Sequence, residues 1–319
     1  PDVFAFSRIV KERYPKVPVV LLTSFSKDIY RRIEEQDRTA LDYIFCWHGN
    51  ADLIIAIIKL IEDRMNADKD ILEGGVQSIL LVEDSIRYYS TYLPAIYKLV
   101  LLQNSEFLKD AYNEQQQILR KRARPKILLA TNYEDAVRIY QRYKSNLLGV
   151  ISDVGFPLRP TDRSSDEKKD AGIDLCRLIR KDNPLMPILL QSSEECFREQ
   201  AEQFEVGFIQ KNSKTLHEEL ADYIGREFAF GDFEFRDPVN GTLIGRAKDL
   251  RDMQKLIAQI PDSVFEYHTS HNHLSKWLYA RGLFPLAASI RALDRAHFES
   301  IEEHRHKLVA LIRDYRTML

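Results

Sequence analysis

The feature that most constrains how this chain folds is an internal repeat. Residues 8–24 read RIVKERYPKVPVVLLTS and residues 177–193 read RLIRKDNPLMPILLQSS, and the two stretches align without a gap. Each combines the basic end of an amphipathic helix, a turn bounded by two prolines and a short apolar strand that ends at a hydroxyl residue. Alternating helices and strands of this kind predict a parallel sheet covered by helices.

The second copy belongs to a longer series of strands and helices. Strands are expected at 78–82, 126–130, 147–152, 188–192 and 207–209, with a final helix over about 215–228. Five such units predict an α/β fold, a doubly wound five-stranded parallel sheet with helices on both faces. The first copy holds only the last two strands and helices of such a unit, the final helix at about 51–64. Its central strands are expected to lie before Pro1 or to be absent.

These patterns divide the chain into four parts. Residues 1–67 are interpreted as the C-terminal half of a degenerate copy, 68–75 as a linker, 76–228 as the complete unit and 229–319 as a mostly helical module. In the last part, short strands are expected at 233–235 and 242–244, and helices at about 246–260, 270–293 and 295–318.

Five residues that carry chemistry stand at strand ends of the complete unit, namely Glu83, Asp84, Asp153, Ser192 and Lys211. In a doubly wound sheet, ligands bind at the carboxyl ends of the strands. Three converging carboxylates repel one another unless a cation neutralises them, and ligation by oxygen alone suits Mg²⁺. A carboxylate beside that ion can attack a phosphoryl group whose oxygens the lysine and hydroxyl hold. The alternative is an ordinary α/β sheet with acidic strand ends.

Composition excludes several other classes of protein. The chain has 46 Lys+Arg against 48 Asp+Glu, which argues against a protein that coats nucleic acid or an anionic membrane. Cys46, Cys176 and Cys196 have no paired spacing, so neither a disulfide framework nor a cysteine zinc site is expected. The longest apolar run is too short to span a membrane, and no signal peptide is recognised, so a cytoplasmic location is expected. A first residue other than Met suggests a piece of a longer chain.

With these residues in place, 76–228 resembles the receiver domains of two-component response regulators. The resemblance implies a flavodoxin-like sheet, with Asp153 as the phosphoacceptor and Lys211 as the lysine beside it. It also implies that Glu83 and Asp84 are the acidic pair that binds Mg²⁺ together with Asp153 and the backbone carbonyl of Gly155. Ser192 and Phe208 take the places of the family's hydroxyl and aromatic switch residues. The phosphoryl donor implied is a sensor histidine kinase or a phosphotransfer protein, and the chain is a possible homodimer.

Three departures from the family pattern stand out. Lys211 is followed by Asn212 where the family has proline, which puts the expected cis peptide in doubt. Asp153 is followed by a long polar loop, RPTDRSSDEKKDAG, that can cover or partner the site. The segment 86–124 is much longer than a first receiver helix and contains Pro94, which should kink or break it. Its second half, Leu108–Arg122, is read as a projecting helix, either solvated or used for pairing.

The first copy keeps Thr23 at the hydroxyl position and Tyr43 as the aromatic residue, but Cys46 or Trp47 stands in place of the lysine, depending on register. Neither can neutralise a phosphoryl oxygen, so this copy is interpreted as a pseudo-receiver. The runs at 85–97, 119–136 and 271–287 also resemble the N-terminal regulatory region of phosphoenolpyruvate-synthase-like proteins. No residues of an enzyme module of that kind are recognised here.

Other readings remain open. Both receiver-like parts can serve as an interaction scaffold without phosphorylation. A haloacid-dehalogenase type of phosphatase needs a general acid two residues after the nucleophile, and that position is Gly155. No separate catalytic domain is recognised, so enzymatic activity beyond self-phosphorylation at Asp153 is not expected. His268, His271 and His273 lie within six residues, where helix capping, polar packing or an exposed face is favoured over a metal site because no carboxylate or cysteine partner has matching spacing.

Overall fold

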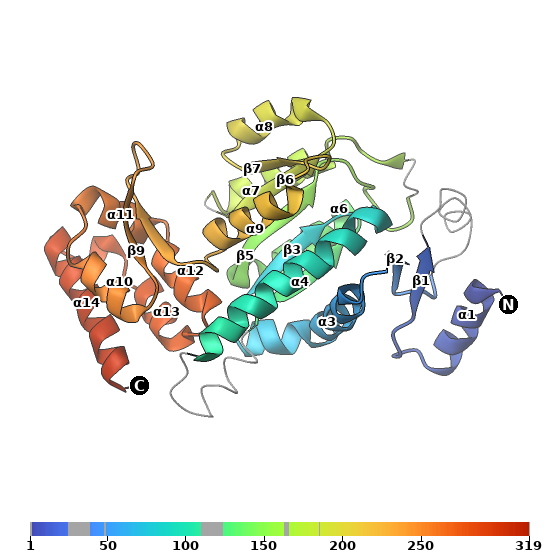
Figure 1. Ribbon diagram of the computed structural model, residues 1–319, viewed down its shortest axis with the longest axis horizontal. Coiled ribbons are helices and arrows are strands. Elements are labelled where there is room, and N and C mark those ends of the chain that lie inside the picture. Colours follow the sequence, from blue (N-terminus) through green and yellow to red (C-terminus); the bar gives the residue numbers. More distant parts are fainter. Residues whose placement is uncertain are drawn as a thin grey trace.

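The computed structural model describes residues 2–24, 39–47, 49–109, 124–162, 166–184 and 186–318. Figure 1 shows a central five-stranded sheet, with the residues of the first copy at one end of the molecule and the C-terminal module at the other. The segment Leu108–Arg122, expected to be a projecting helix, lies almost wholly outside the described residues. Within the described residues, no helix combines the length and the apolar character that crossing a membrane requires.

The central sheet confirms the predicted fold class. Its strands are β3 (Ser78–Val82), β4 (Lys126–Ala130), β5 (Leu147–Asp153), β6 (Ile188–Ser192) and β7 (Gly207–Gln210). All neighbours are parallel, and the order across the sheet is β4-β3-β5-β6-β7. Numbered along the unit, this is the 2-1-3-4-5 order of flavodoxin-like sheets, in which strand order reverses between β3 and β5.

Helices cover both faces of this sheet because both faces of each strand are apolar. Ile79 and Leu81 pack toward α4 (Ile86–Lys109) and α9 (Leu216–Glu227). Leu80 and Val82 point the other way, toward α6 (Tyr133–Tyr143), α7 (Ala171–Asp182) and α8 (Arg198–Gln203). Successive side chains of a strand alternate between faces, so one strand serves two cores. Short 3₁₀ turns at Lys144–Asn146 and Glu195–Phe197 lead into β5 and α8.

Of the two outcomes expected at Pro94, a kink or a break, the break is wrong. α4 runs continuously through this proline, which is itself buried. The neighbouring side chains Leu93, Ile96 and Tyr97 are buried as well. Both sides of the helix are covered, one by the sheet and one by the first unit, so burial of its apolar surface outweighs the missing backbone hydrogen bond.

We call the described part of residues 2–67 the first unit. It contains α1 (Val3–Arg13), a parallel pair formed by β1 (Val20–Ser24) and β2 (Tyr43–Trp47), and α3 (Asp52–Ala67), which continues into a π-helical turn at Asp68–Glu73. Apolar residues of β2 and α3 share one core with α4. The first unit is therefore packed onto the side of the five-stranded domain (Figure 1).

A buried ion pair fixes this junction. Asp63 on α3 is fully buried and pairs with Arg124, which precedes β4. The same carboxylate accepts hydrogen bonds from the Tyr97 hydroxyl at 2.8 Å and the Ile127 backbone N–H at 2.9 Å. The Lys126 ammonium lies 3.7 Å from the same carboxylate, so the buried charge is paired and hydrogen-bonded, as burial requires.

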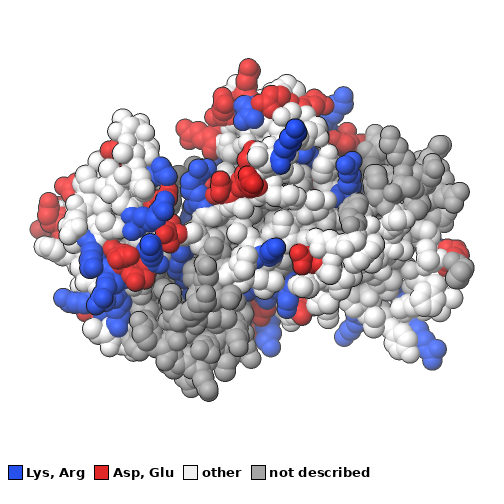
Figure 2. Space-filling view, viewed as in Figure 1, with Lys and Arg blue, Asp and Glu red and all other residues white. Residues whose placement is uncertain are grey.

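The C-terminal module begins with an antiparallel pair, β8 (Phe233–Arg236) and β9 (Leu243–Ala247). β8 lies where a strand was expected, whereas β9 extends three residues beyond the expected 242–244. The module continues with α10 (Leu250–Ile257), α11 (Asp262–Ser270), α12 (His273–Ala280), α13 (Phe284–Arg291), a 3₁₀ turn at Arg295–His297 and α14 (Ile301–Met318). Basic and acidic side chains are interspersed over the face of this module seen in Figure 2.

The single helix expected at 270–293 is wrong, because two helices, α12 and α13, occupy that range. The chain turns between them at Gly282, whose φ of 70° suits glycine, and Pro285 starts the next helix near its first residue. Hydrogen bonds hold α12 against the connection that follows α9. Arg281 and Trp277 of the α12 region donate hydrogen bonds to the carbonyls of Ala229 and Gly231, in the connection between α9 and β8.

Candidate functional site

The carboxyl ends of three strands bring the predicted charged residues together. Glu83 and Asp84 follow β3, Asp153 is the last residue of β5, and Lys211 follows β7. One oxygen from each of the three carboxylates lies within 4.8 Å of the others. Because all these strands are parallel, their carboxyl ends share one edge of the sheet, which explains the convergence.

Lys211 is the centre of this cluster. Its side chain is 3% exposed, its Nζ lies 2.7 Å from Glu83 Oε2, and it also pairs with Asp153 Oδ2. The ammonium group sits 4.3 Å from the centroid of the Tyr88 ring, a cation–π contact from α4. Burial by itself would lower the pKa of Lys211, but Glu83 and Asp153 raise it above its ordinary value. The lysine is therefore a fixed positive charge.

One ammonium group does not balance three carboxylates. Burial, with Asp153 nearby, raises the pKa of Glu83 well above its ordinary value and that of Asp84 to about 7. Glu83 Oε1 accepts a hydrogen bond from the Ser85 backbone N–H at 3.2 Å. Glu83 Oε2 is buried without a well-oriented hydrogen bond, although Lys211 is close to it. The excess of buried negative charge and this underused oxygen fit a small divalent cation with oxygen ligands.

Asp153, like Asp84, is a partly exposed member of the cluster, so outside molecules can reach it. Its side chain is 13% exposed, against complete burial for Glu83. Asp153 Oδ1 accepts the backbone N–H of Val154 at 2.7 Å, and Oδ2 faces Lys211. Gly172 at the start of α7 lies so close that a Cβ there would overlap the Asp153 carbonyl, so the helix can approach only with glycine. The Asp153 carboxylate is thus oriented through both oxygens.

Ser192 and Phe208 lie on the two strands beyond Asp153. Asp153 pairs with Gln191 across β5 and β6, so Ser192 is one residue further along the neighbouring strand. The Ser192 hydroxyl accepts the Glu194 backbone N–H at 3.1 Å. Phe208 is half-buried in β7, where its ring lies 4.8 Å from the guanidinium carbon of Arg198 on α8. Phe208 is therefore packed against α8, on the face away from α4.

Glu167 is a residue of the site that sequence reasoning missed. The long loop after β5 returns through an antiparallel bridge, in which Phe156 and Lys168 exchange backbone hydrogen bonds of 3.3 and 3.2 Å. The bridge places the Glu167 carboxylate against Gly155, where any Cβ would overlap it. Burial and Asp153 raise the pKa of Glu167. The sequence showed a long loop with several acidic residues, but not which of them returns to the site.

The strand pairing also shows which residues of the first unit correspond to Ser192, Phe208 and Lys211. Thr23 pairs with Cys46, and Ser192, its counterpart in the repeat, pairs with Gln210. Trp47 therefore corresponds to Lys211, and the alternative with Cys46 is wrong. By the same register, the residue in the position of Phe208 is Ile44, not Tyr43 as the sequence suggested.

No family model and no curated protein sequence matches the chain. Among solved structures, it is similar to the crystal structure of a protein described as a response regulator receiver domain protein from Clostridium thermocellum. The sequences are 18% identical, the TM-score is 0.30, and the match covers 47% of this chain and 92% of the other. A TM-score of this size does not assign a fold, and the sheet described above is assigned by its own strand order and direction.

Proposed function

We propose that residues 76–228 act as a Mg²⁺-dependent, receiver-type phosphoacceptor in signalling, with Asp153 as the acceptor. The observation that carries this proposal is the arrangement of Lys211 between Glu83 and Asp153, beside a third carboxylate. An ordinary acidic strand end has no need of a buried lysine shared by two carboxylates. A phosphoacceptor needs both the anionic nucleophile and a fixed cation for the incoming oxygens.

Glu83, Asp84 and Asp153, with the backbone carbonyl of Gly155, would hold the Mg²⁺ ion. When bound, the ion supplies positive charge that neutralises the carboxylates and an oxygen of the incoming phosphoryl group. Lys211 binds a second phosphoryl oxygen through its ammonium group, and the Ser192 hydroxyl donates a hydrogen bond to a third. Asp153, oriented by the Val154 N–H, presents a carboxylate oxygen as nucleophile.

The transfer step is a displacement at phosphorus. The bond from phosphorus to the donor nitrogen breaks, a bond from phosphorus to an Asp153 oxygen forms, and the imidazole leaves with the bonding electron pair. The donor is a phosphohistidine on a sensor histidine kinase or a phosphotransfer protein. A small donor such as acetyl phosphate can replace it, with acetate as the leaving group. The proposal places the chain in the cytoplasm, where such donors act.

The output of the phosphoacceptor is the C-terminal module. α9 ends at Glu227, and Arg281 and Trp277 bind the connection that follows it. A rearrangement at Ser192 and Phe208 therefore has a short route to α12. Hydrogen exchange on the whole chain tests this step. Changed exchange in 246–318 on adding beryllofluoride and Mg²⁺ supports the route, and changes confined to 76–228 contradict it.

A phosphate-affinity gel after incubation with acetyl phosphate and Mg²⁺ tests the acceptor itself. The wild-type chain should give a retarded band, and Asp153→Asn or removal of Mg²⁺ should abolish it. Asp182→Asn, an exposed carboxylate on α7 paired with Lys144, is the matched control and should behave like the wild type. An unshifted wild type with acetyl phosphate, carbamoyl phosphate and phosphoramidate would contradict the proposal.

The core shared by the first unit and α4 favours a second candidate. In it, the two receiver-like parts form one rigid docking surface, without phosphorylation, as in the regulatory region of a larger phosphoenolpyruvate-synthase-like protein or in a homodimer. The gel separates the two candidates. A scaffold gives no Asp153-dependent band, whereas a phosphoacceptor does.

A further inference from the structure

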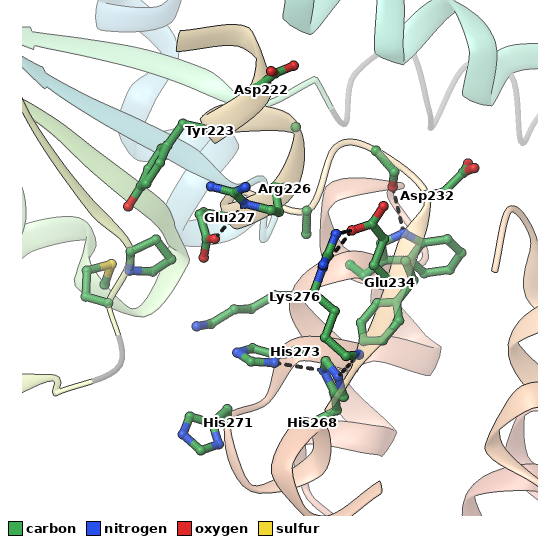
Figure 3. Close-up of a pocket in the computed structure, with 18 of the residues that line it drawn as sticks. Asp222, Tyr223, Arg226, Glu227, Asp232, Glu234, His268, His271, His273 and Lys276 are labelled. Atoms are coloured by element: carbon green, nitrogen blue, oxygen red, sulfur yellow. Dashed lines mark hydrogen bonds and ion pairs between the residues drawn. The ribbon is translucent and has the colours of Figure 1, made fainter. Parts of the chain in front are cut away.

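The cavity between the five-stranded domain and the C-terminal module is lined by charges that largely pair with one another (Figure 3). Glu234 is bound by both Arg236 and Arg246, at 2.6 Å each, and Glu227 pairs with Arg226 at 3.1 Å. These contacts indicate no class of ligand. Buried side chains without a hydrogen bond among the described residues lie elsewhere, and two of them, on α4 and β6, border the carboxylate cluster.

Tyr92 on α4 is the first of these side chains. It is fully buried, and its hydroxyl group has no hydrogen-bond partner among the described residues. Its ring stacks on that of Tyr88, with centroids 5.8 Å apart and an interplanar angle of 20°. The Tyr88 ring in turn lies 4.3 Å from the Lys211 ammonium group, which lies 2.7 Å from Glu83 Oε2. Burial, with Glu83 and Asp153 nearby, raises the pKa of Tyr92, so the hydroxyl is a neutral donor beside these carboxylates.

Gln191 is the second side chain. It is fully buried in β6, and neither polar atom of its amide group has a hydrogen-bond partner among the described residues. Gln191 pairs with Asp153 on β5, so the two side chains stand next to each other on one face of the sheet. That face is the one toward α4, because Leu189, two residues earlier, packs in the core that α4 shares. Tyr92 and Gln191 therefore approach the carboxylates from the same side.

These polar groups destabilise the chain as it stands. A buried donor or acceptor without a partner loses its hydrogen bonds to water and gains none in return. Phenylalanine and methionine fill nearly the same volumes as Tyr92 and Gln191 without that cost. Native structures keep few such groups, and each one calls for a role in another state of the molecule.

The proposed phosphoryl transfer supplies such a state, because it changes the partners of the carboxylates. The Lys211 ammonium group is shared between Glu83, Asp153 and the Tyr88 ring. With three protons in all, it can bind a phosphoryl oxygen only by giving up part of its contact with a carboxylate. Glu83 Oε2 is buried and has no other well-oriented donor among the described residues, so it then needs a new one.

We propose that Tyr92 and Gln191 are positioning residues, which hold the carboxylates when Lys211 turns to the phosphoryl group. The Tyr92 hydroxyl donates to Glu83 Oε2, and the Gln191 amide donates to the Asp153 oxygen that is not bonded to phosphorus. The inference rests on the proposed function and extends it. Both residues act through Glu83 and Asp153, and their cost in the unloaded chain is offset in the loaded one.

Urea unfolding of the whole chain, in EDTA and in Mg²⁺ with beryllofluoride, tests the proposal. In EDTA, Tyr92→Phe and Gln191→Met should raise the urea midpoint or leave it unchanged, because each removes polar atoms that lack a partner. Beryllofluoride should raise the wild-type midpoint, and the concentration that gives half of this increase should be about tenfold higher in both variants. Phosphorylation of Asp153 by acetyl phosphate should be about tenfold slower in both.

Tyr140→Phe on α6 is the matched control. Tyr140 is equally buried, but its hydroxyl donates to Asp182 at 2.9 Å. This variant should have a lower midpoint in EDTA, with the wild-type response to beryllofluoride and the wild-type rate of phosphorylation. The loss of stability and the loss of function are therefore expected in different variants.

Two results would overturn the proposal while leaving Asp153 as the phosphoacceptor. One is a wild-type beryllofluoride response and phosphorylation rate in Tyr92→Phe and Gln191→Met, which would mean that these groups bind only water. The other is a fall of their midpoints in EDTA like that of Tyr140→Phe, which would mean that they have partners in the unloaded chain. A wild-type chain that neither responds to beryllofluoride nor becomes phosphorylated would overturn the proposed function as well.

Discussion

The pair β1-β2 with α3 and the pair β6-β7 with α9 are two versions of one structural unit. Both have two parallel strands in matching register, followed by an amphipathic helix. They differ in what stands at the strand ends. Lys211 follows β7 and pairs with two carboxylates, whereas Trp47, in the corresponding position, is 39% exposed. The same backbone arrangement therefore carries a charged site in one copy, and none among the described residues of the other.

The charges of the first unit serve packing instead. Its buried carboxylate, Asp63, is on α3 and pairs with Arg124, across the junction with the five-stranded domain. The backbone N–H of Cys46 in β2 donates to Ser90 on α4 at 2.9 Å. The first unit thus has the same strand–helix pattern without that site among its described residues, and it forms part of the core around α4. The comparison teaches that the β/α pattern sets the fold, while a few strand-end residues set the chemistry.

The largest expected effect is a loss of stability at the junction between the first unit and the five-stranded domain. Asp63→Ala leaves Arg124 as a buried, unpaired charge and should lower the free energy of unfolding by about 3–5 kcal/mol. Urea unfolding followed by circular dichroism measures this. Asp68→Ala, which removes an exposed partner of Arg142, is the control and should cost much less. Equal losses in both variants would mean that the first unit does not depend on this contact.

The next prediction compares Lys211 with Trp47, the residue in the corresponding position of the first unit. Lys211→Met should slow phosphorylation of Asp153 by acetyl phosphate roughly 100-fold, because a fixed cation for the phosphoryl oxygens is lost. Trp47→Lys should create no second phosphorylated residue, since the first unit has no matching carboxylate cluster among its described residues. Time courses on phosphate-affinity gels measure both. A second shifted band in Trp47→Lys would contradict the difference drawn between the copies.

The pH dependence of Mg²⁺ binding tests the charged site that distinguishes the five-stranded domain from the first unit. Asp84, with a pKa of about 7 raised first by burial, holds a proton that Mg²⁺ must displace. Affinity should therefore fall about tenfold per pH unit below pH 7. In the folded chain this carboxyl binds its proton more tightly than in the unfolded one, so the metal-free protein should become more stable as pH falls from about 7 toward 4.

Titration calorimetry from pH 5.5 to 8 and thermal melts in EDTA measure these two trends. Asp84→Asn should remove the gain in stability at low pH and most of the Mg²⁺ binding. A Mg²⁺ affinity that does not change with pH would show that Asp84 is ionised without the ion, against the burial described here.

The smallest expected effect concerns Glu167, in the loop between β5 and α7. Glu167→Gln removes one negative charge beside Asp84 and Asp153 and should weaken Mg²⁺ binding about threefold, as expected for a carboxylate partly open to water. Asp162→Asn, in the same loop, should leave the affinity unchanged. A larger loss in Glu167→Gln than in Asp84→Asn would mean that the loop, and not the strand end, supplies the main ligand.

The sequence predicted the parallel sheet, its strands and the residues at the strand ends, because these depend on local apolar patterns and on one rule about parallel sheets. It did not predict that α4 continues through Pro94, since that depends on a surface supplied by β2 and α3. Glu167 was missed for a related reason. Its position depends on one backbone bridge, Phe156 to Lys168, that no residue pattern marks. Both the path of α4 through Pro94 and the position of Glu167 depend on contacts between segments separated in the sequence.

The core that the first unit shares with α4 also sets an order of events during synthesis. β2 and α3 are synthesised before α4 and Arg124, and at about 5–20 residues per second this interval lasts a few seconds. Their apolar faces and the Asp63 carboxylate must wait in water during that time. The early segment therefore matures only when later residues arrive, and in a nascent chain it is an expected client for chaperones that hold exposed apolar surface.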